Sequence, residues 1–170
     1  FPNSMSIRAG ILTISDMAFR GQREDTSGAE IRRLLGDSGA LVERYEIIAD
    51  EAVAITERLR RWSDGGTLDL IVTTGGTGLG PRDVTPQATR EIIDYEVPGM
   101  AEAMRQEGRK STPLAMLSRA VVGVRGRTLI VNLPGSPRGV REGLSVLLPV
   151  LPHALELLRG ESSEHRTAGQ

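Results

Sequence analysis

Two kinds of hydrophobic pattern alternate along this chain. Short runs rich in Val, Ile and Leu predict strands over residues 7–15, 41–49 and 68–74, and two further β-like runs cover residues 120–124 and 128–132. Apolar residues at helical spacing predict helices from residue 26, over 51–64, over 100–107 and over 138–158, the last bent or broken by Pro149 and Pro152. Another helix follows the third strand, with Thr85 as N-cap and Pro86 at its first position. The polar segment 17–25 predicts a loop.

Strands that alternate with helices in this way favour an α/β fold with a mostly parallel sheet. The tight turn at residues 125–127 joins the last two β-like runs and predicts a hairpin, hence one antiparallel strand. Because neither a repeat nor a linker stands out, residues 5–160 are predicted to form one domain. Residues 1–4 precede Met5 and are interpreted as an added remnant, and the polar tail over 161–170 is predicted to be disordered.

The strand over residues 68–74 leads into a glycine turn that carries much of the candidate chemistry. Thr74-Gly75-Gly76-Thr77-Gly78 is followed by Pro81-Arg82-Asp83-Val84-Thr85-Pro86. Glycines let backbone N–H groups approach an anion, and the start of the next helix adds partial positive charge. Threonine hydroxyls and Arg82 can donate to phosphate, and Asp83 can bind Mg²⁺. The alternative is a turn that only connects strand and helix.

Two better-known phosphate loops do not match this segment. A Walker loop from Gly75 to Gly80 needs Lys at position 81, where the chain has Pro81. A G-x-G-x-x-G motif from Gly76 and Gly78 needs Gly at the same position. The segment therefore predicts a phosphate cradle of another kind.

Polar residues also follow the other predicted strands. Ser15-Asp16 ends the first, Asp50 follows the second, and Pro134-Gly135-Ser136-Pro137 follows the run over 128–132. Ligands of open α/β sheets bind beyond the carboxyl ends of the strands, so we expect these residues to converge. Like the first loop, the Gly135-Ser136 turn combines a strand end, a glycine, a hydroxyl N-cap and a proline at the first helical position. It is therefore either a second anion site or an ordinary helix start. Asp50 is either a helix N-cap or a functional carboxylate.

Composition narrows the range of functions. A formal net charge of −1 over 170 residues gives no electrostatic reason to expect nucleic acid or an anionic membrane as a partner. The absence of cysteine excludes disulfides, thiolate metal sites and a cysteine nucleophile. His153 and His165 do not form a zinc-site pattern. Since no segment reaches the roughly 20 apolar residues of a membrane span, and no signal peptide is evident, a cytoplasmic protein is predicted.

Taken together, the motifs resemble those of the molybdopterin adenylyltransferase family of molybdenum cofactor biosynthesis. The likeness extends through Ala49-Asp50-Glu51, Pro113-Leu114-Ala115-Met116-Leu117-Ser118-Arg119 and Asn132-Leu133-Pro134-Gly135-Ser136-Pro137, and it covers about residues 8–160. It implies a three-layer α/β/α sandwich. It also implies adenylyl transfer from ATP to molybdopterin, with Mg²⁺ as cofactor, giving adenylylated molybdopterin and pyrophosphate.

The same resemblance implies roles for individual residues. Asp50 and Asp83 match functionally important acidic residues of the family and would be catalytic and hold Mg²⁺. The residues implied in nucleotide and pterin binding are Ser15, Asp16, Thr74, Gly75, Gly76, Thr77, Gly78, Arg82, Ser118, Arg119, Pro134, Gly135 and Ser136. Ser118 and Arg119 could equally belong to a solvated loop or strand entry.

Partners and alternatives follow from the resemblance as well. It implies a homotrimer and a hand-over of the product to a molybdenum-insertion protein. Two other functions stay open: a non-catalytic module that binds or scaffolds molybdopterin, and a nucleotide-processing hydrolase of the same fold.

Overall fold

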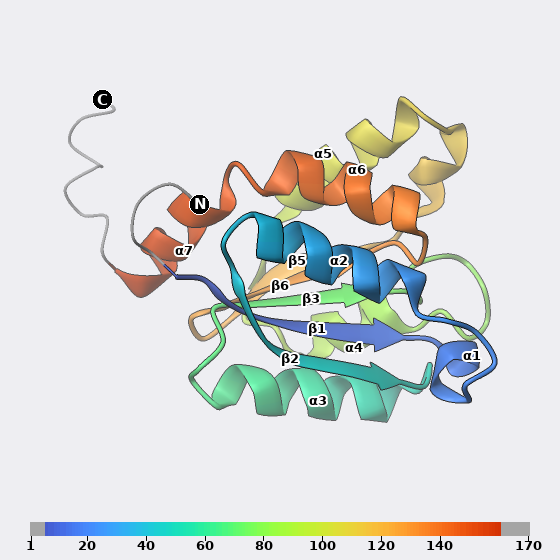
Figure 1. Ribbon diagram of the computed structural model, residues 1–170, viewed down its shortest axis with the longest axis horizontal. Coiled ribbons are helices and arrows are strands. Elements are labelled where there is room, and N and C mark those ends of the chain that lie inside the picture. Colours follow the sequence, from blue (N-terminus) through green and yellow to red (C-terminus); the bar gives the residue numbers. More distant parts are fainter. Residues whose placement is uncertain (1–5, 161–170) are drawn as a thin grey trace.

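Six strands form one sheet in the part of the chain that the structure, a computed structural model, describes, which is residues 6–160 (Figure 1). The strands are β1 (Arg8–Ile14), β2 (Leu41–Ile48), β3 (Leu70–Thr74), β4 (Tyr95–Glu96), β5 (Val122–Arg125) and β6 (Thr128–Leu133). Their order across the sheet is β2-β1-β3-β6-β5-β4. The pairs β1–β2, β1–β3 and β3–β6 are parallel, whereas β5 is antiparallel to both β6 and β4. The predicted mostly parallel sheet with one antiparallel strand is confirmed.

Helices cover both faces of this sheet (Figure 1). They are α1 (Asp16–Phe19), α2 (Thr26–Asp37), α3 (Ala52–Asp64), α4 (Thr85–Ile92), α5 (Pro98–Arg109), the 3₁₀ helix η1 (Pro113–Leu117), α6 (Pro137–Leu147) and α7 (Leu151–Arg159). Buried side chains of α2, α5, α6 and α7 share one hydrophobic cluster, and those of α3 and α4 share another. The three-layer α/β/α sandwich is therefore confirmed.

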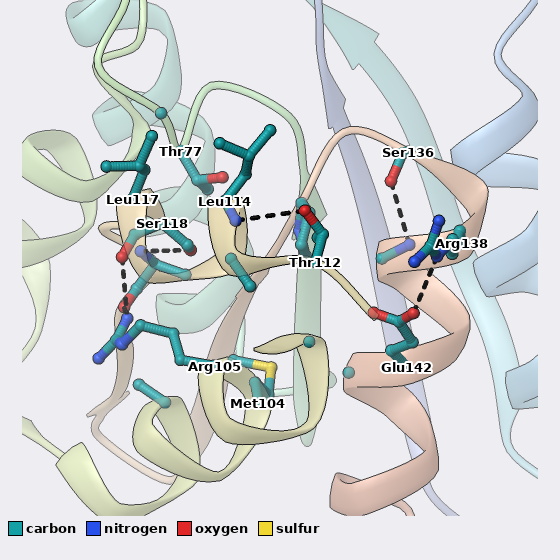
Figure 2. A pocket seen from close by; sticks show the side chains of 18 residues that line it. Thr77, Met104, Arg105, Thr112, Leu114, Leu117, Ser118, Ser136, Arg138 and Glu142 are labelled. Carbon is teal, nitrogen blue, oxygen red and sulfur yellow. Dashed lines mark hydrogen bonds and ion pairs between the residues drawn. The ribbon is translucent and has the colours of Figure 1, made fainter. Parts of the chain in front are cut away.

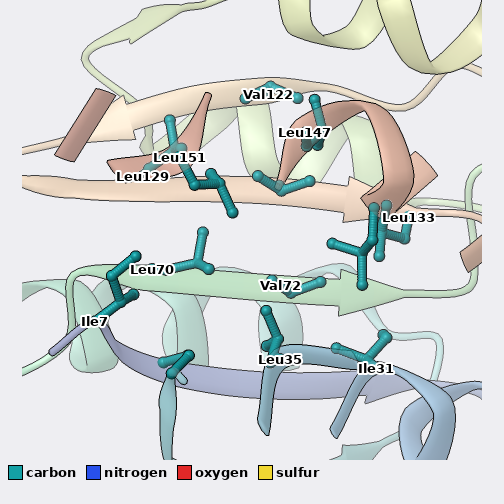
Figure 3. Close-up of a cluster of buried hydrophobic side chains, with 14 of the residues drawn as sticks. Ile7, Ile31, Leu35, Leu70, Val72, Val122, Leu129, Leu133, Leu147 and Leu151 are labelled. Carbon is teal, nitrogen blue, oxygen red and sulfur yellow. The ribbon is translucent and has the colours of Figure 1, made fainter. Parts of the chain in front are cut away.

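The alternation of side chains along each central strand supplies both clusters. In β1, Ile11 packs on the side of α2 and α6, whereas Leu12 and Ile14 pack on the side of α3. Figure 3 shows the first cluster, in which Ile31 and Leu35 of α2 lie beside the central strands. Apolar area buried on both faces stabilises the sheet, whose carboxyl edge then holds the site loops in place.

Trp62 belongs to the buried core of the molecule. It lies on the inner face of α3 with only 4% of its surface exposed, inside the second cluster. Its ring is 2.9 Å from the position a Cβ would take at Gly10 of β1, so the glycine makes room for it. Trp62 is a core residue and not a ligand contact.

Several predicted element boundaries change. The N-cap of α4 is Val84, and Thr85 is already helical, so the prediction of Thr85 as N-cap is wrong by one residue. The Thr85 hydroxyl instead donates to the carbonyl of Gly75 at 3.0 Å and ties the helix to the glycine turn. The segment 17–25, predicted to be a loop, contains most of α1. The helical stretch over 138–158 is interrupted between α6 and α7, as Pro149 and Pro152 predicted.

The predictions for residues 1–4 and 161–170 concern residues outside the described range. Over residues 6–160, the longest helices fall short of the length and apolar character that crossing a bilayer requires.

Candidate functional site

The carboxyl ends of the parallel strands bring the predicted loops together. Two hydrogen bonds join the turn after β3 to the turn after β6: the Thr74 hydroxyl donates to the Pro134 carbonyl at 2.6 Å, and the Gly75 N–H donates to the Leu133 carbonyl at 3.2 Å. A Cβ at Gly135 would lie 3.4 Å from the Cα of Gly75, so the two turns are in close contact. The two candidate anion loops therefore form one continuous wall, as their places at neighbouring strand ends predicted.

Two residues of this wall must be glycine for steric reasons. Gly75 has φ of 98°, and a Cβ there would lie 2.2 Å from the Ile14 carbonyl oxygen. Gly76 has φ of 70°, and a Cβ there would lie 2.4 Å from the Thr85 hydroxyl. Both dihedrals belong to the left-handed region, which L-residues other than glycine rarely occupy. The turn can therefore present bare backbone to a ligand.

A polar pocket of about 430 Å³ opens beside this turn. It is lined by Thr13, Ile14, Ser15, Ala18, Arg23, Glu24, Asp25, Thr26, Ser27, Asp50, Thr74, Gly75, Gly76, Asp83, Gly135, Ser136 and Pro137. Asp50 and Asp83, the two carboxylates singled out in the sequence, both line it. The pocket thus combines acidic side chains with the glycine backbone of both loops.

The Asp50 carboxylate is held rigidly in the polar pocket. Its Oδ2 accepts a hydrogen bond of 2.8 Å from the backbone N–H of Asp16. Burial, and then the nearby charges of Asp16 and Asp83, raise the pKa of Asp50 above its ordinary value. The N-cap of α3 is Glu51, so the alternative that Asp50 caps this helix is wrong. Asp50 is left with a carboxylate that faces the pocket.

The chemistry of the two carboxylates fits a magnesium site that is completed by a ligand. Asp83 Oδ2 accepts a hydrogen bond from the Gly80 N–H at 2.9 Å. It also lies next to Gly78, 3.0 Å from the position that a Cβ would take there. Asp50 Oδ1 would lie 3.2 Å from a Cβ at Gly76. Over residues 6–160, no group of three or more His, Cys, Asp and Glu side chains could hold a metal ion alone. Mg²⁺ is commonly held by one or two carboxylates together with substrate phosphates.

A second, largely apolar pocket of about 350 Å³ is bordered by α5, η1 and α6 (Figure 2). Its lining residues are Thr77, Gly78, Ala101, Met104, Arg105, Gly108, Thr112, Leu114, Ala115, Leu117, Ser118, Ala120, Pro134, Ser136, Arg138, Gly139, Glu142 and Gly143. Figure 2 shows side chains of η1 and α5 facing those of α6 across it. Ser136 lines both pockets, so the two cavities meet at this residue.

The structure gives different surroundings to the predicted polar site residues. Ser15 lines the polar pocket, and its hydroxyl caps α1 by accepting from the Ala18 N–H at 3.2 Å. The Ser136 hydroxyl caps α6 in the same way, by accepting from the Gly139 N–H at 3.0 Å. Ser118 and Thr77 line the apolar pocket. The Thr74 hydroxyl donates to a backbone carbonyl and thereby joins the two loops.

Two predicted arginines contact protein groups. Arg119 donates to the carbonyl of Gly78 at 2.8 Å and to that of Asp83 at 2.7 Å, so it braces both ends of the loop between them. Arg82 donates to the carboxylates of Asp16 and Glu51. Arginine forks of this kind fix the geometry of the loops that form the site.

Sequence reasoning missed two parts of the site. Residues 23–27 line the polar pocket where α2 begins, although the sequence analysis gave them no role in the site. Asp25 caps α2 by accepting from the Gly28 N–H at 3.0 Å. The predicted helix start at Thr26 is confirmed, and the N-cap signal in Asp25-Thr26-Ser27-Gly28, after the first strand, could have marked this start as part of the site. The second missed part is the side of the apolar pocket formed by Met104 and Arg105 of α5 and by Glu142 of α6.

Comparisons with known proteins agree with this geometry. The family model described as "Probable molybdopterin binding domain" matches residues 10–153. The chain belongs to this family of molybdenum cofactor biosynthesis. A curated member, the molybdopterin adenylyltransferase of Helicobacter pylori, is 41% identical over 157 residues, which cover 91% of this chain and 89% of that protein. The family resemblance predicted from the motifs is confirmed.

Solved structures of the family share the fold. The molybdopterin biosynthesis enzyme MoaB of Thermus thermophilus is 58% identical, with a TM-score of 0.85 over 91% of this chain and 97% of that one. The Mog protein of Mycobacterium ulcerans is 41% identical, with a TM-score of 0.86 over 92% and 99% of the two chains. Relatives also occur inside longer proteins: the Drosophila melanogaster molybdenum cofactor synthesis protein cinnamon is 43% identical, and the chain spans 26% of its length.

Proposed function

We propose that this family member transfers an adenylyl group from Mg-ATP to the terminal phosphate of molybdopterin. The products would be adenylylated molybdopterin and pyrophosphate. The observation that carries the proposal is the pair of pockets that meet at Ser136, one polar with two carboxylates and one largely apolar. The curated relatives named molybdopterin adenylyltransferase support it at 36% to 41% identity over most of the chain.

The polar pocket suits the phosphates of the nucleotide. The bare backbone at Gly75, Gly76 and Gly135 allows close approach of an anion, and α6 begins directly after Ser136. Asp50 and Asp83 would hold Mg²⁺ together with the phosphates. When bound there, the ion would neutralise charge on the polyphosphate and orient the leaving pyrophosphate.

The apolar pocket suits the pterin. Met104, Leu114 and Leu117 offer apolar surface to a flat ring, and the hydroxyl-bearing residues Ser118 and Ser136 lie in the same lining. A terminal phosphate directed toward Ser136 would reach the boundary of the polar pocket. In this proposal, the nucleotide and the pterin phosphate would approach each other at Ser136, which lines both pockets.

Placement would then supply most of the catalysis. An oxygen of the acceptor phosphate attacks the α-phosphorus of ATP, a new phosphorus–oxygen bond forms, and the bond to the bridging oxygen breaks with release of pyrophosphate. The acceptor is already anionic, so the step needs no strong base. The rigid loops and Asp50 contribute by holding the reacting groups in register.

The test is pyrophosphate release by the purified protein with Mg-ATP, measured with and without molybdopterin. We expect release that depends on the pterin and is lost in Asp83→Asn, while that variant folds normally. Asp37→Asn is the matched control, because Asp37 is an exposed aspartate at the end of α2 with 71% of its side chain accessible.

Each other outcome identifies an alternative. Pterin binding without pyrophosphate release would favour a binding or scaffold module. Release of other phosphate products without pterin would favour a nucleotide-processing hydrolase. Full activity in Asp83→Asn would contradict the role given to that carboxylate. The homotrimer, the hand-over to a molybdenum-insertion protein and the cytoplasmic location stay predictions, and light scattering of the purified protein tests the first.

A further inference from the structure

Asp16 and Asp50 hold each other by a reciprocal pair of hydrogen bonds. The Asp16 N–H donates to Asp50 Oδ2 at 2.8 Å, and the Asp50 N–H donates to Asp16 Oδ1 at 3.0 Å. The two residues follow neighbouring parallel strands, β1 and β2, and are 34 positions apart. Because each carboxylate is fixed by the other's backbone, the orientation of the Asp50 carboxylate depends on where Asp16 lies.

Arg82 in turn fixes Asp16. Its Nε donates to Asp16 Oδ2 at 3.0 Å and its Nη2 donates to Asp16 Oδ1 at 3.1 Å, which is a two-pronged contact. The same Nη2 donates to Glu51 Oε1 at 2.9 Å. The Arg82 guanidinium holds the pKa of Asp16 below its ordinary value, so the Asp16 carboxylate stays ionised. A residue of the loop after β3 thereby clamps the segments that follow β1 and β2.

We infer that Arg82 is a positioning residue that holds the Asp50 carboxylate in its working orientation through Asp16. The sequence resemblance implied a direct contact between Arg82 and the substrate, but the guanidinium is engaged by Asp16 and Glu51. About half of the Arg82 side chain is exposed, and exposed ion pairs contribute little to global stability. Its main effect is therefore on local geometry. The catalytic consequence rests on the proposed function.

The first experiment compares Arg82→Gln with a matched control, Arg90→Gln. Both arginines have 54% of the side chain accessible, and Arg90 pairs with Glu96 away from the pockets. We expect kcat for pterin-dependent pyrophosphate release to fall by roughly 10- to 100-fold in Arg82→Gln, as loss of a supporting contact behind a metal ligand does. The KM for ATP and the melting temperature should change little, and Arg90→Gln should behave as the wild type.

A double-mutant cycle separates positioning from direct substrate contact. If Arg82 acts through Asp16, the double variant Arg82→Gln/Asp16→Asn should lose no more activity than Asp16→Asn alone. Losses that multiply, together with a raised KM for ATP, would show that Arg82 contacts the nucleotide and would overturn the inference. Arg82→Lys keeps the charge but loses the fork, so it should resemble Arg82→Gln.

A readout without turnover keeps the inference testable if the proposed function fails. Hydrogen exchange at the backbone N–H groups of Asp16 and Asp50 reports the reciprocal bonds directly in the ligand-free protein. We expect exchange at both to accelerate by roughly tenfold in Arg82→Gln and to stay unchanged in Arg90→Gln. Unaltered protection in Arg82→Gln would overturn the positioning role. Absence of pyrophosphate release by the wild type would instead reject the proposed function alone.

Discussion

Asn132 donates a hydrogen bond of 3.0 Å to the hydroxyl of Thr89 and thereby joins β6 to α4 inside the molecule. The same amide nitrogen donates to the Thr73 hydroxyl at 3.1 Å, and the amide oxygen accepts from the Val121 N–H at 3.1 Å. Asn132 has no exposed surface. A buried amide with its donors and acceptor satisfied fixes the end of β6, two residues before Pro134 of the pocket wall.

Asn132→Leu should therefore destabilise the fold by about 2–4 kcal/mol, because it leaves the buried Val121 N–H without an acceptor. Denaturant unfolding measures the change. Ser145→Ala on the exposed side of α6 is the control and should stay within about 0.5 kcal/mol of the wild type. An Asn132→Leu protein as stable as that control would contradict the structural role.

Gly75→Ala should be poorly tolerated. Its left-handed backbone and the Ile14 carbonyl at 2.2 Å from the added Cβ leave no room without movement of the backbone. We expect a loss of about 1–3 kcal/mol in unfolding free energy and a displaced turn. Gly36→Ala in the last turn of α2 has open space and should stabilise the fold by about 0.4–1 kcal/mol. Equal effects of the two substitutions would refute the assignment of this turn.

Arg119→Gln should loosen the loop from Gly78 to Asp83 because both carbonyl contacts of the guanidinium are lost. Pterin-dependent turnover should fall by roughly 10- to 100-fold, since small displacements of a catalytic group are costly. Arg127→Gln, at an exposed position of the β5–β6 turn, is the matched control. Unchanged kinetics in Arg119→Gln would show that the loop keeps its shape without this brace.

Tyr45 gives a prediction about alkaline pH. Burial, together with the hydrogen bond to the Asp25 carboxylate, raises the pKa of Tyr45 to about 12. The folded state keeps a phenol proton that the unfolded chain loses near pH 10, so stability should decrease between about pH 10 and 12. Ultraviolet titration of the folded protein should show a tyrosinate transition near pH 12, and this transition should vanish in Tyr45→Phe. A single tyrosine transition near pH 10 in the folded protein would contradict this environment.

The residues at the strand ends show what the sequence could predict about the site. Local signals marked Gly75, Gly76 and Ser136, because strand, glycine turn and helix start are consecutive in the chain, and the parallel sheet brings their ends to one edge. The sequence left two roles open for Asp50, because an aspartate between a strand and a helix can be either a helix N-cap or a carboxylate that lines a pocket. The structure separates these roles, because Glu51 is the N-cap of α3 and the Asp50 carboxylate contacts Asp16, 34 positions away.

The side of the apolar pocket formed by α5 and α6 could not be predicted from the sequence, for a physical reason. Its walls come from α5, η1 and α6, and residues such as Met104 and Glu142 look like ordinary members of amphipathic helices. The role of Arg82 could not be predicted either. An arginine in a phosphate-type loop suggests an anionic ligand, and nothing in the local sequence indicates that Asp16 and Glu51 are its partners. Both the pocket and the role of Arg82 depend on contacts between residues that are far apart in the sequence.

The meeting of the two cavities at Ser136 also bears on the design of inhibitors. Two fragments that each fill one pocket could be joined by a short tether across this residue. Such a compound would lose translational freedom once instead of twice, so its affinity should exceed that of either fragment by roughly 10²- to 10⁴-fold. A tether that is too short to let both fragments bind at once would not increase the affinity.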